Sequence, residues 1–374
     1  MDRASTSKFE KVSMLGFGVF ALVGILTFSG VDVREVNMAA VAQADMSGAI
    51  KAVDSYEDTK DEEIVPTDIR SEYSVTFRIA GDFMFARGVH RKFNNDPTLS
   101  LDKIGTGFFG DADANIVNLE GSISDISDND IAPSGSFKFV FPRSMLSVLK
   151  RHGINVVSLA NNHSFDNGRE GFFATQKILK GYRIKFFGGY TDEFVSDVSI
   201  VKGTNLNLVL IGVHTLYQTP DITNIIKKYK ANKSNRVLIM PHWGVEYDFK
   251  HSKRQEELAH SWIDAGADIV VGSHPHVVQD VGVYKGVPII YSLGNFLFDQ
   301  TEQNTKEKGV QDGMTLHGKF IKGKLALYAV PIRLENFQPQ LIKNKKKKAK
   351  ILKDFYKPWN KHATKINGVN MFVF

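Results

Sequence analysis

Residues 268–278 read Asp-Ile-Val-Val-Gly-Ser-His-Pro-His-Val-Val, an apolar run that ends in two histidines. A short apolar run is typical of a buried strand, and the glycine and proline that follow it indicate a turn. Because Pro275 separates the two histidines, we expect both on an extended turn rather than on one helix face. We therefore interpret His274 and His276 as candidate metal ligands at the end of a strand.

The same arrangement, an apolar run followed by polar side chains, is repeated along the chain. Strands are predicted at residues 74–80, 116–119, 154–159, 206–213, 237–240, 268–271 and 287–293. Six of them lead into polar residues, which include Asp82, Glu120, Asn161, Asn162, His163, His242, His274, His276 and Asn295. Helical patterns at 143–152, 169–179 and 253–264 each end near a glycine. This alternation predicts an α/β fold, in which the carboxyl ends of strands converge on one site.

The residue types at the strand ends define the expected chemistry. Carboxylate, amide and imidazole groups suit divalent Mn, Fe or Zn. The chain has no cysteine, which excludes a disulfide framework, a thiolate zinc site and a cysteine nucleophile. We therefore predict a centre of one or two divalent ions that polarises an anionic substrate oxygen and activates a bound water.

Charge is distributed unevenly along the 374 residues, whose formal net charge is +6. Residues 341–374 hold ten lysines and one aspartate, whereas the rest of the chain is neutral or mildly acidic. Because the predicted folded body lacks a basic stripe, nucleic acid is not an expected partner. We predict that 341–374 form a solvated basic tail, which attracts an anionic polymer or anionic lipid or serves only solubility.

The N-terminus has the pattern of an export signal or membrane anchor. Lys8 and Lys11 precede an apolar run at 14–28, and a small-residue cleavage pattern follows at 42–44. We favour a retained anchor over cleavage, and predict a signal anchor at 1–33 and a polar linker at 34–72. A folded domain at 73–340 would then lie outside the cytoplasm, held to the cytoplasmic membrane by a single span.

Seven short motifs occur in the order and spacing of one known family. They are GDFMFAR (81–87), NLEG (118–121), ANNH (160–163), DNG (166–168), HWGVEY (242–247), GSHPHV (272–277) and SLGNF (292–296). On these motifs the chain resembles the CapA family of poly-γ-glutamate capsule biosynthesis proteins, which are similar to the calcineurin-like metallophosphoesterases. The resemblance implies a four-layer α/β/β/α sandwich with a metal site at the strand ends.

Site residues follow from matching the motifs position by position. The resemblance implies metal ligands at Asp82, Glu120, Asn162, His242, His274 and His276. It implies catalytic roles for His163 and Asp166 and substrate contacts at Glu246 and Asn295. Arg87 is a further candidate substrate contact, because guanidinium groups suit carboxylates; the alternative is a surface ion pair. Met84 stands where the metallophosphoesterases have a histidine ligand, so a single metal, or binding without cleavage, stays open.

The function implied by the resemblance is the biosynthesis or export of a poly-γ-glutamate capsule, a virulence-related envelope polymer. Implied partners are this polymer or another anionic envelope polymer, a capsule synthase ligase and small membrane subunits. The chain has no Gly-rich Lys-Ser/Thr phosphate loop, so the ligase chemistry is expected elsewhere. Two alternatives remain, a metal-dependent phosphoesterase acting outside the cytoplasm and a non-enzymatic scaffold of the capsule complex.

Overall fold

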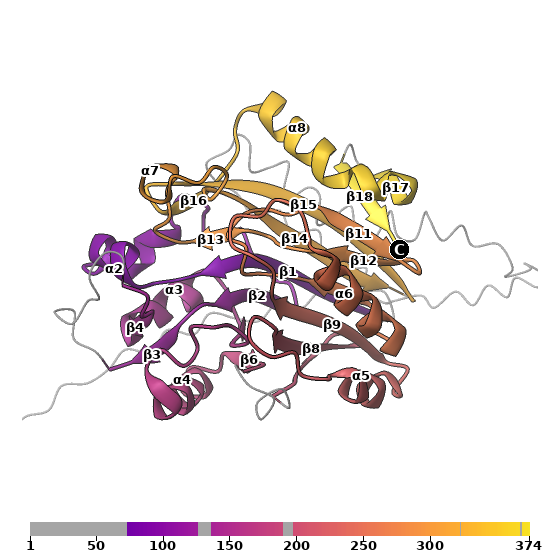
Figure 1. The fold of residues 1–374 in the computed structure, drawn as a ribbon, viewed down its shortest axis with the longest axis horizontal. Coiled ribbons are helices and arrows are strands. Elements are labelled where there is room, and N and C mark those ends of the chain that lie inside the picture. Colours follow the sequence, from indigo (N-terminus) through magenta and orange to yellow (C-terminus); the bar gives the residue numbers. More distant parts are fainter. Residues whose placement is uncertain (1–72, 126–135, 190–196, 322, 367–368) are drawn as a thin grey trace, which may run out of the picture. The chain divides into compact units, whose positions relative to one another are not determined.

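The computed structural model describes residues 73–125, 136–189, 197–321, 323–366 and 369–374 (Figure 1). Its larger sheet has ten strands in the order β17-β18-β15-β14-β1-β2-β5-β6, with β13 beside β1 and β16 beside β15. The strands are β1 (Ser74–Phe83), β2 (Ala114–Leu119), β5 (Val156–Ser158), β6 (Lys185–Phe187), β13 (Asn295–Leu297), β14 (Asp312–Ile321), β15 (Lys324–Glu335), β16 (Gln338–Leu341), β17 (Ala363–Ile366) and β18 (Val369–Val373). Because β1, β2, β5 and β6 are parallel, their carboxyl ends share one edge.

A second sheet has six strands in the order β11-β12-β10-β9-β8-β7. These strands are β7 (Ser199–Lys202), β8 (Asn207–His214), β9 (Asn235–His242), β10 (Ile269–Val271), β11 (Val281–Tyr284) and β12 (Val287–Ile290). The four inner strands β8, β9, β10 and β12 are parallel, so they also end at one edge. A separate pair, β3 (Ser122–Ser124) and β4 (Val140–Pro142), lies outside both sheets.

Alternating side chains place the two sheets face to face. In β8, Leu208 and Leu210 pack into a core shared with residues of β1, such as Phe77. The intervening Val209 and Ile211 pack instead with helix residues such as Trp262. This two-residue period is what a strand buried on both faces requires.

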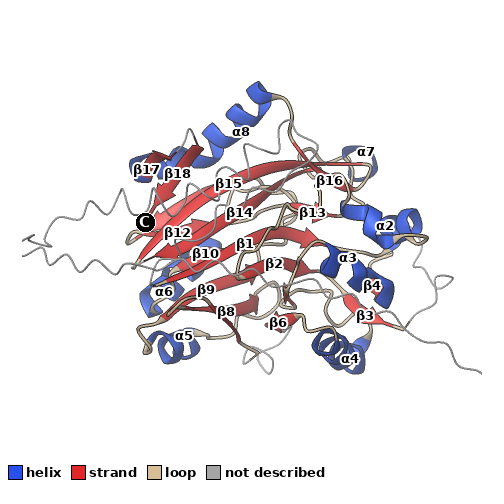
Figure 2. Ribbon diagram, turned by 180° about the vertical axis from the view of Figure 1, so that it is seen from behind, coloured by secondary structure: helices blue, strands red, loops and turns tan. Residues whose placement is uncertain are grey.

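Helices cover the outer face of each sheet (Figure 2). Residues of α5 (Thr223–Lys230) and α6 (Lys253–Ala265) pack on the six-stranded sheet. Helices on the ten-stranded sheet are α2 (Arg87–Phe93), α3 (Leu146–Arg151) and α4 (Gly168–Gly181), with the 3-10 turns η2 (Pro97–Leu101) and η4 (Arg143–Met145). The predicted mixed α/β fold is therefore confirmed.

The predicted helices differ from the observed ones mainly at their ends. The helix expected at 253–264 is α6, which begins with a capping box between Ser252 and Gln255 and ends at Gly266, at φ 116°. The helix expected at 143–152 is divided, because its first turn is the 3-10 turn η4. A further short helix, α7 (Glu302–Thr305), lies beyond β13.

The C-terminal segment is folded, which corrects the expectation of a solvated basic tail at 341–374. It forms α8 (Lys345–Tyr356), the 3-10 turn η6 (Lys357–His362) and the strands β17 and β18, and β18 pairs with β15. Phe355, Tyr356 and Trp359 are buried in the core between the sheets. Phe355 and Tyr356 end α8 and Trp359 lies in η6, so the apolar side chains that follow the lysine run pack this segment on the core.

Within the described residues, no helix is both long and apolar enough to cross a membrane. The anchor predicted at 1–33 and the linker predicted at 34–72 lie outside the described residues. Both therefore stay predictions.

Candidate metal centre

Strand pairing brings the predicted ligands together. The parallel pairing of β1 with β2 and with β13 places Asp82 beside Asn118 and beside Asn295. Glu120 follows β2 directly, and His242 ends β9 in the facing sheet. All of these side chains are completely buried, so the strand ends form a polar cluster inside the protein.

Two groups of three side chains could each hold a metal ion. Within each group, the ligand atoms all lie within 4.8 Å of one another. One group is Asp82, Glu120 and His242, and the other is Glu246, His274 and His276. The structure brings five of the six predicted ligands into these groups. The sixth, Asn162, contacts the first group, because its Oδ1 lies 2.8 Å from His242 Nε2.

Unsatisfied polar atoms indicate that these residues fit a divalent cation. Glu120 Oε1 and His274 Nδ1 are buried and make no hydrogen bond. Burial also raises the pKa of the Glu120 carboxyl well above its ordinary value. Buried carboxylates normally need a compensating cation, and oxygen and imidazole donors are those that Mn, Fe and Zn accept.

His276 is held in one orientation by its neighbours. Its Nδ1 lies 3.0 Å from Asn295 Oδ1 and 3.3 Å from Asp82 Oδ2, which leaves Nε2 facing Glu120 Oε1 at 3.6 Å. Burial acts to lower the pKa of His276, but the Glu120 and Asp82 carboxylates outweigh it and raise this pKa to about 9. The imidazolium thus balances the buried carboxylates when no other cation does.

Further polar contacts that the sequence did not indicate support this cluster. Asn118 Nδ2 donates to Asp82 Oδ1 at 2.9 Å, and Asn161 Nδ2 donates to Asn118 Oδ1 at 3.1 Å. Ser273 Oγ lies 3.0 Å from His242 Nδ1. These contacts fix the ligands in place, as outer partners of metal ligands commonly do.

His214 directly follows the strand predicted at 206–213 and is not among the predicted site residues, yet it lies beside the centre. It pairs with His242 across β8 and β9, and the centroids of the two rings are 5.9 Å apart. His214 ends the only predicted strand for which no polar cluster was recognised. The signal was therefore present in the sequence, as a histidine after an apolar run.

His163 and Asp166 form a hydrogen-bonded pair, and His163 lines the pocket beside the centre. His163 Nδ1 lies 2.8 Å from Asp166 Oδ2, and the same oxygen accepts a hydrogen bond of 2.6 Å from the Phe139 amide. The Phe139 ring stacks on the imidazole with centroids 3.8 Å apart. Since Nδ1 is occupied, Nε2 is the nitrogen left for exchange of a proton with a ligand.

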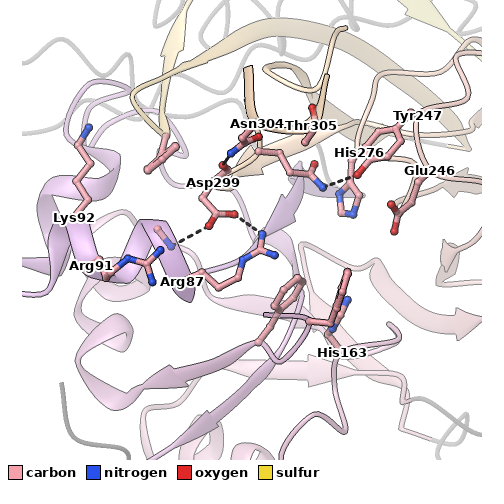
Figure 3. Close-up of a pocket in the computed structure, with 15 residues that line it drawn as sticks. Arg87, Arg91, Lys92, His163, Glu246, Tyr247, His276, Asp299, Asn304 and Thr305 are labelled. Carbon is pink, nitrogen blue, oxygen red and sulfur yellow. Dashed lines mark hydrogen bonds and ion pairs between the residues drawn. The ribbon is translucent and has the colours of Figure 1, made fainter. Parts of the chain in front are cut away.

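An open pocket of about 730 Å³ lies against the centre (Figure 3). His163, Glu246, Tyr247 and His276 line one part of it, so the predicted substrate contact Glu246 faces the pocket. A hydrogen-bond chain runs along this wall: Gln300 Nε2 donates to the Tyr247 hydroxyl at 3.2 Å, and Asn295 Nδ2 donates to Gln300 Oε1 at 3.0 Å. The second metal-ligand group is therefore directly connected to the pocket wall.

Two predicted substrate contacts have other partners in the structure. Arg87 lines the pocket but is paired with Asp299, and its guanidinium lies 4.6 Å from the centre of the Phe139 ring. Arg87 is thus ion-paired, but both side chains are only 11% exposed, so the pair is not the surface pair expected as the alternative. Asn295 is completely buried and does not line the pocket, and its amide contacts His276, Gln300 and the Val310 carbonyl.

The turn that carries the two histidines is left-handed, not extended as expected. His274 has φ 99° and His276 has φ 57°, values that residues other than glycine rarely adopt. In this turn the His276 ring and the His274 backbone amide each lie 3.3 Å from Asp82 Oδ2. Such strain is characteristic of functional sites.

Comparison with solved structures gives matches with TM-scores below 0.5. A novel phosphatase from Mycoplasma pneumoniae matches with a TM-score of 0.42 and 13% identity, over 70% of this chain and 94% of that one. A hypothetical protein from Thermus thermophilus matches with a TM-score of 0.40 and 16% identity, over 71% and 96%.

Sequence relatives are more informative than these structures. The capsule biosynthesis protein CapA of Bacillus anthracis is 29% identical over 326 residues, which cover 81% of this chain and 78% of that protein. The PGA biosynthesis protein CapA of Bacillus subtilis is 31% identical over 185 residues, which cover 45% and 49%. The family model described as bacterial capsule synthesis protein PGA_cap matches residues 76–300. The chain therefore belongs to this bacterial capsule synthesis family.

Proposed function

We propose that the protein acts in the synthesis or export of a polyglutamate capsule, at the outer face of the cytoplasmic membrane. The names of its Bacillus relatives, which refer to capsule and PGA biosynthesis, support this assignment. Residues 1–33 would anchor the chain as a single span, which accords with their basic and apolar sequence. Its partners would be the polymer, the capsule synthase ligase and small membrane subunits.

We further infer a centre of metallophosphoesterase type that binds one or two divalent ions. The observation that carries this inference is the burial of Asp82 and Glu120 among three histidines, one of which, His276, lines a pocket. Asp82, Glu120, Asn162, His242, His274 and His276 would hold the ions, with Glu246 at the pocket side. When bound, divalent ions supply Lewis-acid polarisation of an anionic oxygen.

The chain's own residues then perform binding and orientation. Asn295 and Ser273 keep His276 and His242 in fixed orientations. The Tyr247 hydroxyl lies on the pocket wall, accepts a hydrogen bond from Gln300 and is also hydrogen-bonded to the Glu246 side chain. Burial, with the Glu246 carboxylate beside it, raises the pKa of Tyr247 far above its ordinary value, so the hydroxyl stays protonated near neutral pH.

A second candidate function, hydrolysis of a phosphate ester, is favoured by one specific observation. His163 lines the pocket with Nδ1 bound to Asp166, which is the arrangement of a histidine that delivers a proton to a leaving oxygen. Binding alone would not require this pair. The two candidates therefore differ in whether His163 is needed after the ligand is bound.

Metal analysis of the purified full-length chain, combined with ligand assays, tests these proposals. We would compare the wild type with Asp82→Asn and His274→Ala, using His251→Gln as the matched control. His251 is also paired with an aspartate, at 3.0 Å from Asp280, but it lies outside the centre. Each protein would be assayed for metal content, for binding of γ-glutamyl polymer, and for turnover of this polymer and of a phosphodiester.

We expect one or two ions in the wild type and in His251→Gln, and reduced metal content in the two ligand variants. Polymer binding should fall with metal content and on treatment with a chelator. Polymer binding that survives in the metal-free variants would contradict the first candidate. Phosphodiester turnover without polymer binding would establish the second candidate in its place.

A further inference from the structure

Arg87, the first residue of α2, contacts two aromatic rings beside the candidate centre. Its guanidinium carbon lies 4.6 Å from the centre of the Phe139 ring and 5.7 Å from the centre of the Phe298 ring. The two rings meet edge to face, with their centroids 5.8 Å apart. Because a cation near the face of an aromatic ring is attracted to it, one guanidinium group stabilises the positions of both rings.

Each of these rings contacts a different histidine of the candidate centre. Phe139 stacks on the imidazole of His163, with centroids 3.8 Å apart. Phe298 lies against the imidazole of His276, with centroids 4.7 Å apart. Figure 3 shows both histidines and Arg87 around the same pocket. Arg87 is therefore linked, through one ring each, to the candidate proton donor and to a member of a metal-ligand group.

Asp299 holds the Arg87 guanidinium in one orientation. The Nη2 atom of Arg87 is paired with Asp299 Oδ1, and its Nη1 donates to the Ser136 carbonyl at 3.2 Å. Asp299 Oδ2 in turn accepts a hydrogen bond of 2.9 Å from the Gly88 amide. A Cβ at position 88 would lie 2.9 Å from this oxygen and 3.0 Å from the Asp299 Cβ, so the glycine permits the contact.

This arrangement costs free energy at Arg87. Its backbone has φ 48°, a value that residues other than glycine rarely adopt, and its buried Nε makes no hydrogen bond. Backbone strain of this kind is concentrated at functional sites, where the surrounding contacts hold it in place. Here those contacts are the Asp299 carboxylate and the two rings, and the side chain is only 11% exposed. The role of Arg87 is therefore directed at the protein interior.

We propose that Arg87 and Asp299 are a positioning pair, which fixes the orientation of both histidines through the two aromatic rings. The inference rests on the proposed function, in which His163 delivers a proton and His276 binds a metal ion. It differs from the substrate contact expected for Arg87, because the guanidinium acts through protein groups. Loss of the pair should loosen both histidines together, whereas loss of one ring should loosen only its own histidine.

The test uses the full-length chain and variants that each remove one part of this network. The variants are Arg87→Gln, Asp299→Asn, the double variant of both, Phe298→Leu and Phe139→Leu. The matched control is Arg333→Gln, because Arg333 is also ion-paired, at 2.7 Å from Asp312, but does not line the pocket. Competition with a chromogenic chelator would measure metal affinity. Kinetics with a phosphodiester at saturating metal would give kcat and KM, and thermal unfolding would check that each variant is folded.

Metal affinity is the deciding readout, because it does not require turnover. We expect it to fall about tenfold or more in Phe298→Leu, Arg87→Gln and Asp299→Asn, as it does when outer partners of a metal ligand are lost. The double variant should lose no more than either single variant, since the two side chains act as one unit. Phe139→Leu should keep the metal affinity of the wild type.

Turnover should depend on the other ring. We expect kcat to fall about 10- to 100-fold in Phe139→Leu and in both single variants of the pair, with KM little changed, because a misplaced proton donor slows only the step in which it acts. In Arg333→Gln, metal affinity, kcat and KM should match the wild type. An ion pair with a merely structural role would change the unfolding temperature and none of these three quantities.

Three outcomes would overturn the positioning pair. Wild-type metal affinity in folded Arg87→Gln and Asp299→Asn would exclude it while leaving the proposed centre in place. Additive losses in the double variant would show two independent side chains. An equal loss in Arg333→Gln would show a general loosening of the fold. A wild type that binds no metal would instead exclude the proposed centre, and this role of the pair with it.

Discussion

The imidazole Nδ1 of His163 lies 2.8 Å from Asp166 Oδ2. A second pair on the same chain, His251 and Asp280, has nearly the same geometry, with a distance of 3.0 Å. In both pairs an aromatic ring stacks on the imidazole at 3.8 Å. His163 lines the pocket, whereas neither His251 nor Asp280 does. The second pair can therefore serve as the control when the role of His163 is tested by substitution.

Replacing His163 by Gln should separate catalysis from metal binding. If the centre hydrolyses a phosphodiester, kcat should fall about 10²- to 10⁴-fold, because a positioned proton donor is lost. Metal content and KM should change little, because His163 belongs to neither ligand group. The measurement is steady-state kinetics alongside metal analysis.

The matched control for this experiment is His251→Gln, which should keep wild-type turnover. Loss of bound metal in His163→Gln would refute the assigned role, since His163 would then be supporting the ligands. An equal loss of kcat in His163→Gln and His251→Gln would also refute the assigned role of His163.

Asn295→Leu should weaken metal binding although Asn295 is not an expected ligand. The substitution removes the oxygen that lies 3.0 Å from His276 Nδ1, so the imidazole loses its fixed orientation. Loss of such a partner typically costs about 10- to 100-fold in metal affinity. Competition with a chromogenic chelator would measure the change. The control is Asn207→Leu, which removes a hydrogen bond to Asn235 at the start of β8; equal affinities in the two variants would contradict the positioning role.

His317 should make stability depend on pH independently of the metal centre. Burial lowers its pKa well below the ordinary value, so His317 stays neutral in the folded state. The unfolded chain takes up a proton below about pH 6.5, so acid favours unfolding. In His317→Gln, the free energy of unfolding should fall less steeply with acidification, by up to about 1.4 kcal/mol per pH unit.

Denaturant unfolding at about pH 7.5 and about pH 5, with a chelator present, would measure this difference. His242 and His274 also have lowered pKa values, because burial disfavours their charged forms, but both variants share that contribution. Parallel pH profiles for the wild type and His317→Gln would show that His317 is protonated in the folded protein.

Trp359→Ala should destabilise the domain by about 3–5 kcal/mol, as expected for a large side chain removed from a core. Trp359 is completely buried, and its Nε1 donates to the Gly282 carbonyl at 2.9 Å. In contrast, Lys346→Ala on the exposed face of α8 should change stability by no more than about 0.5 kcal/mol. Equal, small effects in denaturant unfolding would mean that the C-terminal segment is a dispensable tail.

The candidate centre could be predicted because its residues share one sequence pattern. Asp82, His242 and His274 each follow an apolar strand, and parallel strands end at a common edge. Glu120 follows the same rule after β2. Such a pattern depends on local periodicity alone, which the sequence displays directly.

Partners that are distant in sequence could not be predicted in this way. Nothing near Arg87 in the chain indicates that Asp299 neutralises it, because that contact depends on the packing of the start of α2 against the segment that follows β13. The tail was mispredicted for a related reason. Its net charge is dominated by lysines, whereas the buried faces of Phe355 and Trp359 decide its structure.

The pairing of β1 with β14 has a consequence for biosynthesis. β1 is the first described strand to be made, yet one of its neighbours in the sheet, β14, is among the last. The sheet edge of β1 therefore stays open until most of the chain has left the ribosome, and such non-local pairing is slow and prone to misassociation. The two metal-ligand groups can therefore form only after the C-terminal half, which contains His242, Glu246, His274 and His276, has been translated.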